Sequence, residues 1–201
     1  RTERSYQGTT EDEAPRTTAY AYYGSGDTNG NEYQLKTIDG PLSGTVDVTT
    51  YKYATVTGAN LVKSGLVQVI NPLGHTTSVT AHDAYGRPTT IVDPNGVTTT
   101  LVYHPRGWLR ARTVDGQTTT FAYDDVGQLE QVTLPDGAWI GYAYDAAHRL
   151  TDITDNAGNR IHYTLDALGN RVQEDTCNGA SCTAGNTTRS LQRMYNSLNR
   201  L

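Results

Sequence analysis

Polar and apolar side chains alternate in short runs along much of the chain. Thr119, Phe121 and Tyr123 share one side of such a run, in a stretch rich in Thr and Tyr that is too short for a helix. The pattern predicts a strand of about seven residues. A shorter alternating run follows, for example at residues 129–134 and again at 150–154. We therefore expect two short strands in succession.

Two kinds of tight turn separate the predicted strands. The first begins with Asp and has Gly in fourth place, as in residues 124–127, 83–86 and 166–169. Asp accepts hydrogen bonds from a turn backbone and Gly takes positive φ, which predicts a type I turn with a following bulge. The second kind has Pro in second place and Gly in fourth, as in residues 71–74, 93–96 and 134–137. Reversing turns at both strand ends favour an antiparallel meander over a parallel β-helix, whose strands all run one way.

Both turns recur with a period of about 21 residues. The first series is Gly86, Gly107, Gly127 and Gly169, with His148 filling the place between the last two; the second is Gly74, Gly96, Gly116, Gly137 and Gly158. Such repetition indicates one elongated repeat domain.

The repeated strings resemble the YD repeat, also called the RHS repeat. The resemblance is carried by residues 123–129 (YDDVGQL), 144–150 (YDAAHRL) and 84–87 (AYGR). The matching positions are Tyr103, Tyr123 and Tyr144, then Asp83, Asp124, Asp145 and Asp166, and the two glycine series. Departures stand at His82, His104, His148 and Leu165, where we expect weaker individual turns.

The repeats divide the chain unevenly. We predict a degenerate N-terminal repeat region at 1–50, YD repeats at 51–174, an irregular loop at 175–189 and the start of a further, truncated repeat at 190–201. Residues 195–201 reproduce the opening of another copy and then stop, so we expect a fragment of a longer protein. Unpaired edge strands of such a meander could also pair with another copy.

The resemblance implies an all-β fold in which hairpins form an extended, curved sheet, a piece of a β-shell. Bacterial members wind such repeats into a hollow shell around a toxic C-terminal domain. The implied role is a wall segment, the implied partner is the rest of the same polypeptide, and the implied location is secreted or at the bacterial cell surface. The alternative is a cell-surface module in which Trp108, Trp139 and Tyr142 stack on carbohydrate or protein, although the same rings could be cross-strand packing pairs.

Composition and charge argue against several classes of partner. The net charge of −5 and the absence of a basic run argue against nucleic-acid binding, and no apolar stretch is long enough to span a membrane. Cys177 and Cys182 are the only cysteines and form a possible disulfide, but they are too few ligands for a metal.

We predict no catalytic, cofactor or metal site. The aspartates recur with the fold as turn formers, whereas a catalytic pair would occur once. Residues 93–96 (DPNG) resemble part of a self-cleaving segment found in the family, but their place within the repeat series favours a turn.

Overall fold

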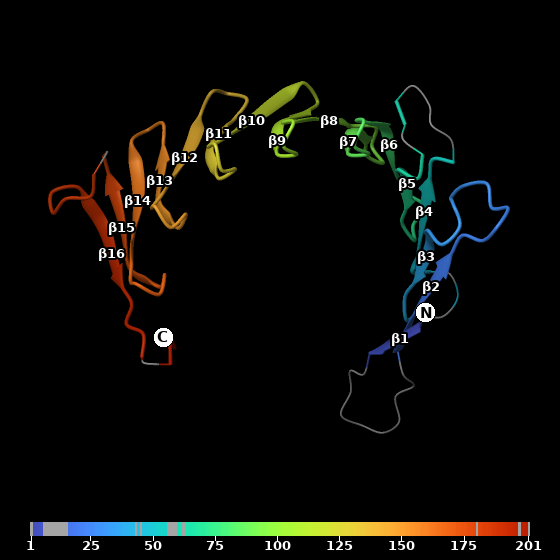
Figure 1. Cartoon of the computed structure of the whole chain (residues 1–201), viewed down its shortest axis with the longest axis horizontal. Helices are drawn as coiled ribbons and strands as arrows, with labels where there is room; N and C mark the ends of the chain where they lie inside the picture. The colour runs from blue at the N-terminus through green and yellow to red at the C-terminus, as the bar shows by residue number, and fades with distance from the viewer. Residues whose placement is uncertain are drawn as a thin grey trace. The chain divides into compact units, whose positions relative to one another are not determined.

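The computed structural model describes residues 2–5, 16–42, 44, 46–55, 60–61, 63–179, 181–196 and 198–200. Over these ranges every regular element is a β-strand (Figure 1). The chain divides into two compact units, residues 1–101 and 102–201, and each unit is an antiparallel meander. The predicted all-β class is therefore confirmed.

The first unit contains the strands up to β8, whose last two residues belong to the second unit. Each strand pairs with the next one along the chain. Their bounds are β1 Thr2–Ser5, β2 Arg16–Tyr22, β3 Leu35–Asp39, β4 Val48–Tyr53, β5 Leu66–Ile70, β6 Thr76–His82, β7 Pro88–Val92 and β8 Thr98–Tyr103.

The second unit continues in the same way. Each strand from β9 to β15 pairs antiparallel with the next, so the parallel alternative is excluded. The bounds are β9 Leu109–Val114, β10 Gln117–Tyr123, β11 Leu129–Thr133, β12 Trp139–Tyr144, β13 Leu150–Asp155, β14 Asn159–Leu165, β15 Arg171–Asn178 and β16 Thr187–Gln192.

The turn that joins β9 to β10 differs from its counterparts. Val114 pairs directly with Gln117, which leaves only Asp115 and Gly116 in the loop, both at positive φ. This is the φ pattern of a two-residue type I′ turn, for which Asp-Gly is a preferred sequence. The shorter loop accounts for the step of 20 residues between Gly96 and Gly116.

The two faces of the second unit differ in polarity. Directly paired residues share a face. Phe121, Val132 and Ile140 therefore lie on one face. Tyr142, Ile153 and Ile161 lie on that same face, because Tyr142 is two residues from Ile140 in β12. The opposite side carries a polar row made of Asp152, His162, Asp175 and Ser190, one from each of β13 to β16. The few buried residues of the second unit, including Asp152, Tyr163 and Cys177, lie on these strands.

The irregular loop predicted at 175–189 is wrong in its bounds. β15 extends through Asn178, and β16 already begins at Thr187. The composition of this stretch is typical of a loop, but Thr176 and Cys177 pair with Ile161 and Arg160 of β14 and so prolong the strand. Only residues 179–186 connect the two strands, and the last repeat starts earlier than 190.

The degenerate N-terminal region has long connections in place of tight turns. Residues 23–34 join β2 to β3, and the ring of Tyr23, which is 4% exposed, lies against Gly30. Asn31 Nδ2 donates to Ser64 Oγ at 3.1 Å, and Gln34 Nε2 donates to the Ser64 carbonyl at 2.9 Å. The connection after β2 is therefore held to the one after β4.

Candidate functional site: the row of YD turns

Five turns of the YD type lie at the same end of the strands in the second unit. We call the row of strand ends on that side one edge of the sheet. Every second connection of a meander falls at the same edge, which gathers turns that are about 21 residues apart in sequence. They span residues 104–108, 124–128, 145–149, 166–170 and 196–200, and we call them the turn row.

One side-chain acceptor at the first position organises each turn, and in the aspartate turns it is a carboxylate oxygen. Asp124 Oδ1 accepts hydrogen bonds from the N–H groups of Val126 at 3.0 Å and Gln128 at 2.8 Å, while the Asp124 carbonyl accepts from Gly127 at 3.1 Å. Asp83, Asp145 and Asp166 make the corresponding contacts in their own turns. The backbone donors of these turns are thus satisfied within a few residues.

The predicted glycines take the conformation that the turns require. Gly86, Gly107, Gly127 and Gly169 of the first series, and Gly96, Gly116, Gly137 and Gly158 of the second, all have positive φ. The hairpins β6–β7, β10–β11, β12–β13 and β14–β15 also show a register shift beside the turn, as a bulge produces.

Residues that depart from the repeat pattern still form the turn. His104 stands in the place of Asp, and its Nδ1 accepts the N–H of Arg106 at 3.2 Å. His148 takes the place of Gly at φ 62°, and Asn199 does the same at φ 59°. Asn196 Oδ1 accepts the N–H groups of Leu198 and Arg200 as an aspartate would.

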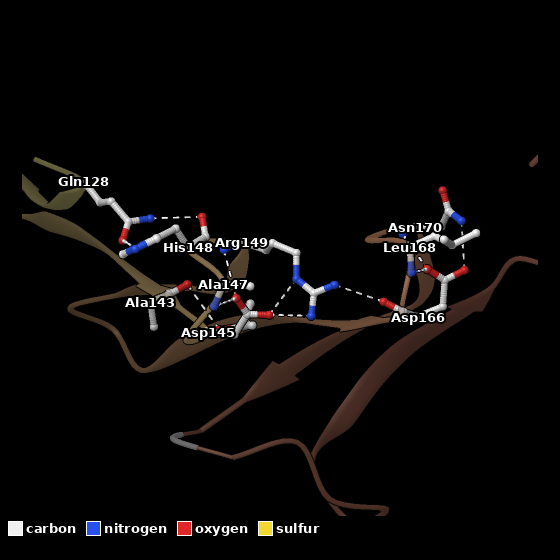
Figure 2. Close-up of polar contacts among 10 residues, drawn as sticks. Gln128, Ala143, Asp145, Ala147, His148, Arg149, Asp166, Leu168 and Asn170 are labelled. Atoms are coloured by element: carbon white, nitrogen blue, oxygen red, sulfur yellow. Dashed lines mark hydrogen bonds and ion pairs between the residues drawn. The ribbon is translucent and has the colours of Figure 1, made fainter. Parts of the chain in front are cut away.

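Consecutive turns are joined by the side chain that follows the fourth position. Gln128 Nε2 donates to the His148 carbonyl at 3.0 Å, and its Oε1 lies 2.8 Å from His148 Nδ1 (Figure 2). Arg149 donates from NH1 to the Asp166 carbonyl at 3.0 Å. Asn170 Nδ2 donates to Asn199 Oδ1 at 2.5 Å. Contacts between residues 17 to 29 positions apart therefore form a ladder along the edge.

The first step of this ladder is aromatic. Trp108 occupies the same place as Gln128, and its ring fills the space where a Cβ on Gly127 would lie. His104 stacks on the Trp108 ring with centroids 5.3 Å apart, and Tyr123 contacts it at 5.4 Å. These rings, with Arg106 and Arg110, line an open hollow of about 430 Å³.

Hydrogen bonding stabilises the charged form of the turn aspartates. The side chain of Arg149, and then its backbone N–H, lowers the pKa of Asp145 below its ordinary value. Asn170 acts on the pKa of Asp166 in the same order. Arg149 also pairs with Asp145 at 2.7 Å, so one guanidinium holds its own turn and the next.

The repeat tyrosines end the strands that enter the turns. Tyr103, Tyr123 and Tyr144 are the last residues of β8, β10 and β12. The Tyr144 hydroxyl donates to the Leu129 carbonyl at 2.9 Å, which ties β12 to β11 beside the turn. The tyrosines thus contribute to packing and hydrogen bonding within the sheet.

Cys177 and Cys182 form a disulfide at the other edge. Cys177 is fully buried at the end of β15, and the bond closes part of the 179–186 connection onto that strand. The N–H of Gly179 donates to the Gly158 carbonyl at 2.7 Å, which fixes this connection to the turn that precedes β14.

The polar row on the opposite face combines acids, a base and a hydroxyl without forming a catalytic triad. His162 Nδ1 and Asp152 Oδ1 lie 2.6 Å apart, and Arg160 also binds that oxygen. The hydrogen bond from Ser190, followed by that from Gln173, lowers the pKa of Asp175. Ser190 Oγ accepts a hydrogen bond from Gln173 Nε2 at 3.5 Å, and among the described residues it has no bond to the imidazole that would activate it.

The three aromatic residues of the binding-module alternative do not form one surface. Trp139 and Tyr142 are three apart in β12 and therefore lie on opposite faces. Trp139 packs against Gly141, and Trp108 packs over Gly127. Both indoles therefore lie over a glycine of the sheet, Trp139 over one in its own strand and Trp108 over one in the next turn of the row.

Neither a metal centre nor a membrane helix is found where the structure gives positions. No three His, Cys, Asp or Glu side chains of the placed residues gather to hold an ion. Among the same residues no helix has the length and hydropathy needed to cross a bilayer.

A family model for the RHS repeat matches residues 63–98, 82–115, 103–138 and 144–180. These matches cover more than half of the chain. The chain belongs to the RHS repeat family. A search of the curated proteins found no match to it.

Solved structures similar to this RHS chain include three Tc toxin assemblies. The complex TcdB2-TccC3-Cdc42 aligns with a TM-score of 0.62 at 18% identity, covering 98% of this chain and 12% of that chain. TcdB2-TccC3 without its hypervariable C-terminal region gives 0.58 at 19% identity, with 98% and 11% covered. The Photorhabdus luminescens Tc holotoxin pore gives 0.57 at 18% identity, again with 98% and 11% covered.

These likenesses establish a shared fold. The chain spans about one eighth of the length of the first of these solved chains.

Sequence reasoning missed the residues that link one RHS turn to the next. Trp108, Gln128, Arg149 and Asn170 share the place after the fourth turn position but differ in chemistry. The signal available in the sequence was the recurrence, at steps of 20 or 21 residues, of a side chain able to reach the next turn. The polar row was also missed, because its members meet only once the strand register is known.

Proposed function

We propose that this chain is a wall segment of a hollow RHS shell that encloses a toxic C-terminal domain of the same bacterial polypeptide. The observation that carries the proposal is the turn ladder, in which Gln128, Arg149 and Asn170 each bind the following turn. A wall must resist separation between neighbouring hairpins. Contacts that repeat at each turn supply that resistance along the whole edge, in addition to the backbone pairing of the strands.

The proposal assigns the chain no catalytic step. The recurring aspartates use their side-chain oxygens to organise turns, as Asp124 does toward Val126 and Gln128. The Asp93-Pro94-Asn95-Gly96 segment is one such turn, since Asp93 Oδ1 accepts the N–H groups of Asn95 and Val97. Its carboxylate is engaged in the fold, which supports a structural role for this segment.

The proposed partners are the further repeats and the C-terminal domain of a longer chain, and the proposed location is secreted or at the cell surface. The disulfide between Cys177 and Cys182 supports export, because such bonds persist in oxidising compartments.

Protease protection of the parent polypeptide tests the proposal. We expect the open reading frame around this segment to encode many further repeats and a non-repetitive C-terminal domain. In the purified parent that domain should survive a protease concentration that degrades the same domain expressed alone. Equal degradation in both settings, or a reading frame that passes from these repeats into a membrane anchor, would contradict encapsulation.

A further inference from the structure

The tips of the turn row carry exposed apolar side chains where polar residues are usual. The third position of four successive turns is filled by Val126, Ala147, Leu168 and Leu198, which we call the apolar rim. Val126 is 63% exposed, Leu168 79% and Leu198 69%. Ala146 and Ala167, beside them in the second position, are exposed as well. The tips of these two neighbouring turns carry no charge.

The turn geometry does not demand apolar residues at this position. In the turn that follows β7, Asn95 occupies the same place and donates its N–H to Asp93 Oδ1 at 2.9 Å, just as Leu168 donates to Asp166 Oδ1 at 2.9 Å. The opposite edge of the second unit exposes Asp115, Asp136 and Asn156 at its turn tips, beside Leu134 and Ala157. Two edges with similar turns therefore differ in surface chemistry, which points to a use for the apolar one.

Two features of the rim lower the cost of burying it. The N–H of each rim residue is already bonded to the side chain that opens its turn, so covering a rim residue leaves its own N–H satisfied. The ladder between turns fixes the tips relative to one another, which reduces the entropy lost on association (Figure 2).

We propose that the apolar rim is an association surface for a second copy of this chain, rim against rim. Successive turns of the row are two strands apart, which sets the rim side chains at a spacing of roughly 9.5 Å. An identical row has the identical period, so the leucines of one copy can enter the gaps between the tips of the other over several turns. Such a contact is isologous, with the same residues contributed by both partners.

The absence of charge at the central tips suits this occupant. Two copies meeting at Ala146, Ala147, Ala167 and Leu168 bring no like charges together, whereas two copies meeting at Asp115 and Asp136 would. The apolar rim is made of turn side chains and is distinct from the unpaired backbone groups of β16. The proposed association does not depend on whether the chain encloses a toxin.

Sedimentation equilibrium of the 201-residue chain over a concentration series tests this surface. We expect the mass to rise toward two chains, and we expect the double variant Leu168→Glu/Leu198→Glu to raise the dissociation constant at least tenfold. The matched control is Leu73→Glu, because Leu73 is also 79% exposed at a turn tip but lies at a turn of the second kind, after β5. A milder pair, Leu168→Ser/Leu198→Ser, with circular dichroism for each variant, separates loss of association from loss of fold.

Three outcomes would overturn the proposal. One is a single-chain mass at every concentration. Another is association that is unchanged in the double variant, which would place the contact elsewhere, for example at β16. The third is flotation of the chain with neutral phosphatidylcholine vesicles that is abolished by the double variant, which would assign the rim to a lipid surface.

Discussion

At the residue scale, the turn glycines meet two separate demands. Gly127 and Gly137 both have positive φ, at 96° and 87°. Around Gly137 there is open space, whereas a Cβ on Gly127 would overlap the ring of Trp108. The first requirement is a backbone conformation with positive φ. The second, at Gly127 alone, is the absence of a Cβ where the Trp108 ring packs.

Alanine at these two positions should separate the demands. Gly137→Ala should lower the free energy of unfolding by about 1–2 kcal/mol, because a Cβ at positive φ is strained. Gly127→Ala should cost that amount plus about 1–3 kcal/mol for overpacking against Trp108. Urea unfolding followed by circular dichroism measures both. Equal losses would show that the Trp108 contact carries no energy.

At the element scale, a side-chain acceptor at the first position of a turn matters more than whether an aspartate supplies it. His104 and Asn196 replace aspartate and still accept the backbone donors of their turns. Charge adds a second contribution, because the hydrogen bonds from Arg149 lower the pKa of Asp145, and those from Asn170 lower the pKa of Asp166.

The turns should therefore weaken in acid. A carboxyl whose folded pKa is lowered contributes stability that is present above its unfolded pKa, about 3.9, and is lost as the pH falls through the folded pKa. Asp145→Asn keeps the acceptor oxygen but removes this titration. We expect its urea midpoint to fall less steeply than that of the unmodified chain below pH 4.

The matched control is Asp125→Asn. Asp125 is exposed, and its side chain accepts no hydrogen bond from any residue that the structure places. Its substitution should leave the acid slope unchanged. An Asp145→Asn slope identical to that of the unmodified chain would contradict the role of the turn carboxylates.

The turns were predictable from sequence because their causes are local. Asp124 and Gly127 act within four residues, so the type of turn and its period can be read directly. The ladder was not predictable in the same way, since Arg149 reaches Asp166 across 17 residues and only the meander brings them together. At residues 175–178 local composition was misleading, because pairing with β14 overrode a loop-like sequence.

At the scale of the whole molecule, most contacts join neighbouring hairpins, as in other repeat architectures. Stability is then close to a sum over hairpins and their interfaces. Ending the chain at Asn170 removes β15 and β16, together with the disulfide and the Asn170–Asn199 step of the ladder. Ending it at Arg149 removes β13 and β14 as well.

These two truncations should lower stability in steps while the preceding strands keep their structure. Hydrogen exchange should remain slow in β10 and β11 of both shortened chains, because their pairing partners are retained. The step from the full chain to Asn170 should cost about 2 kcal/mol more than the step from Asn170 to Arg149, because the first step alone removes a disulfide, which closes a short loop. A reducing agent should remove that difference, since the full-length chain then lacks the bond as well. Loss of protection throughout the chain on removing β15 and β16 alone would show that the sheet folds as one cooperative unit, and additivity between hairpins would be refuted.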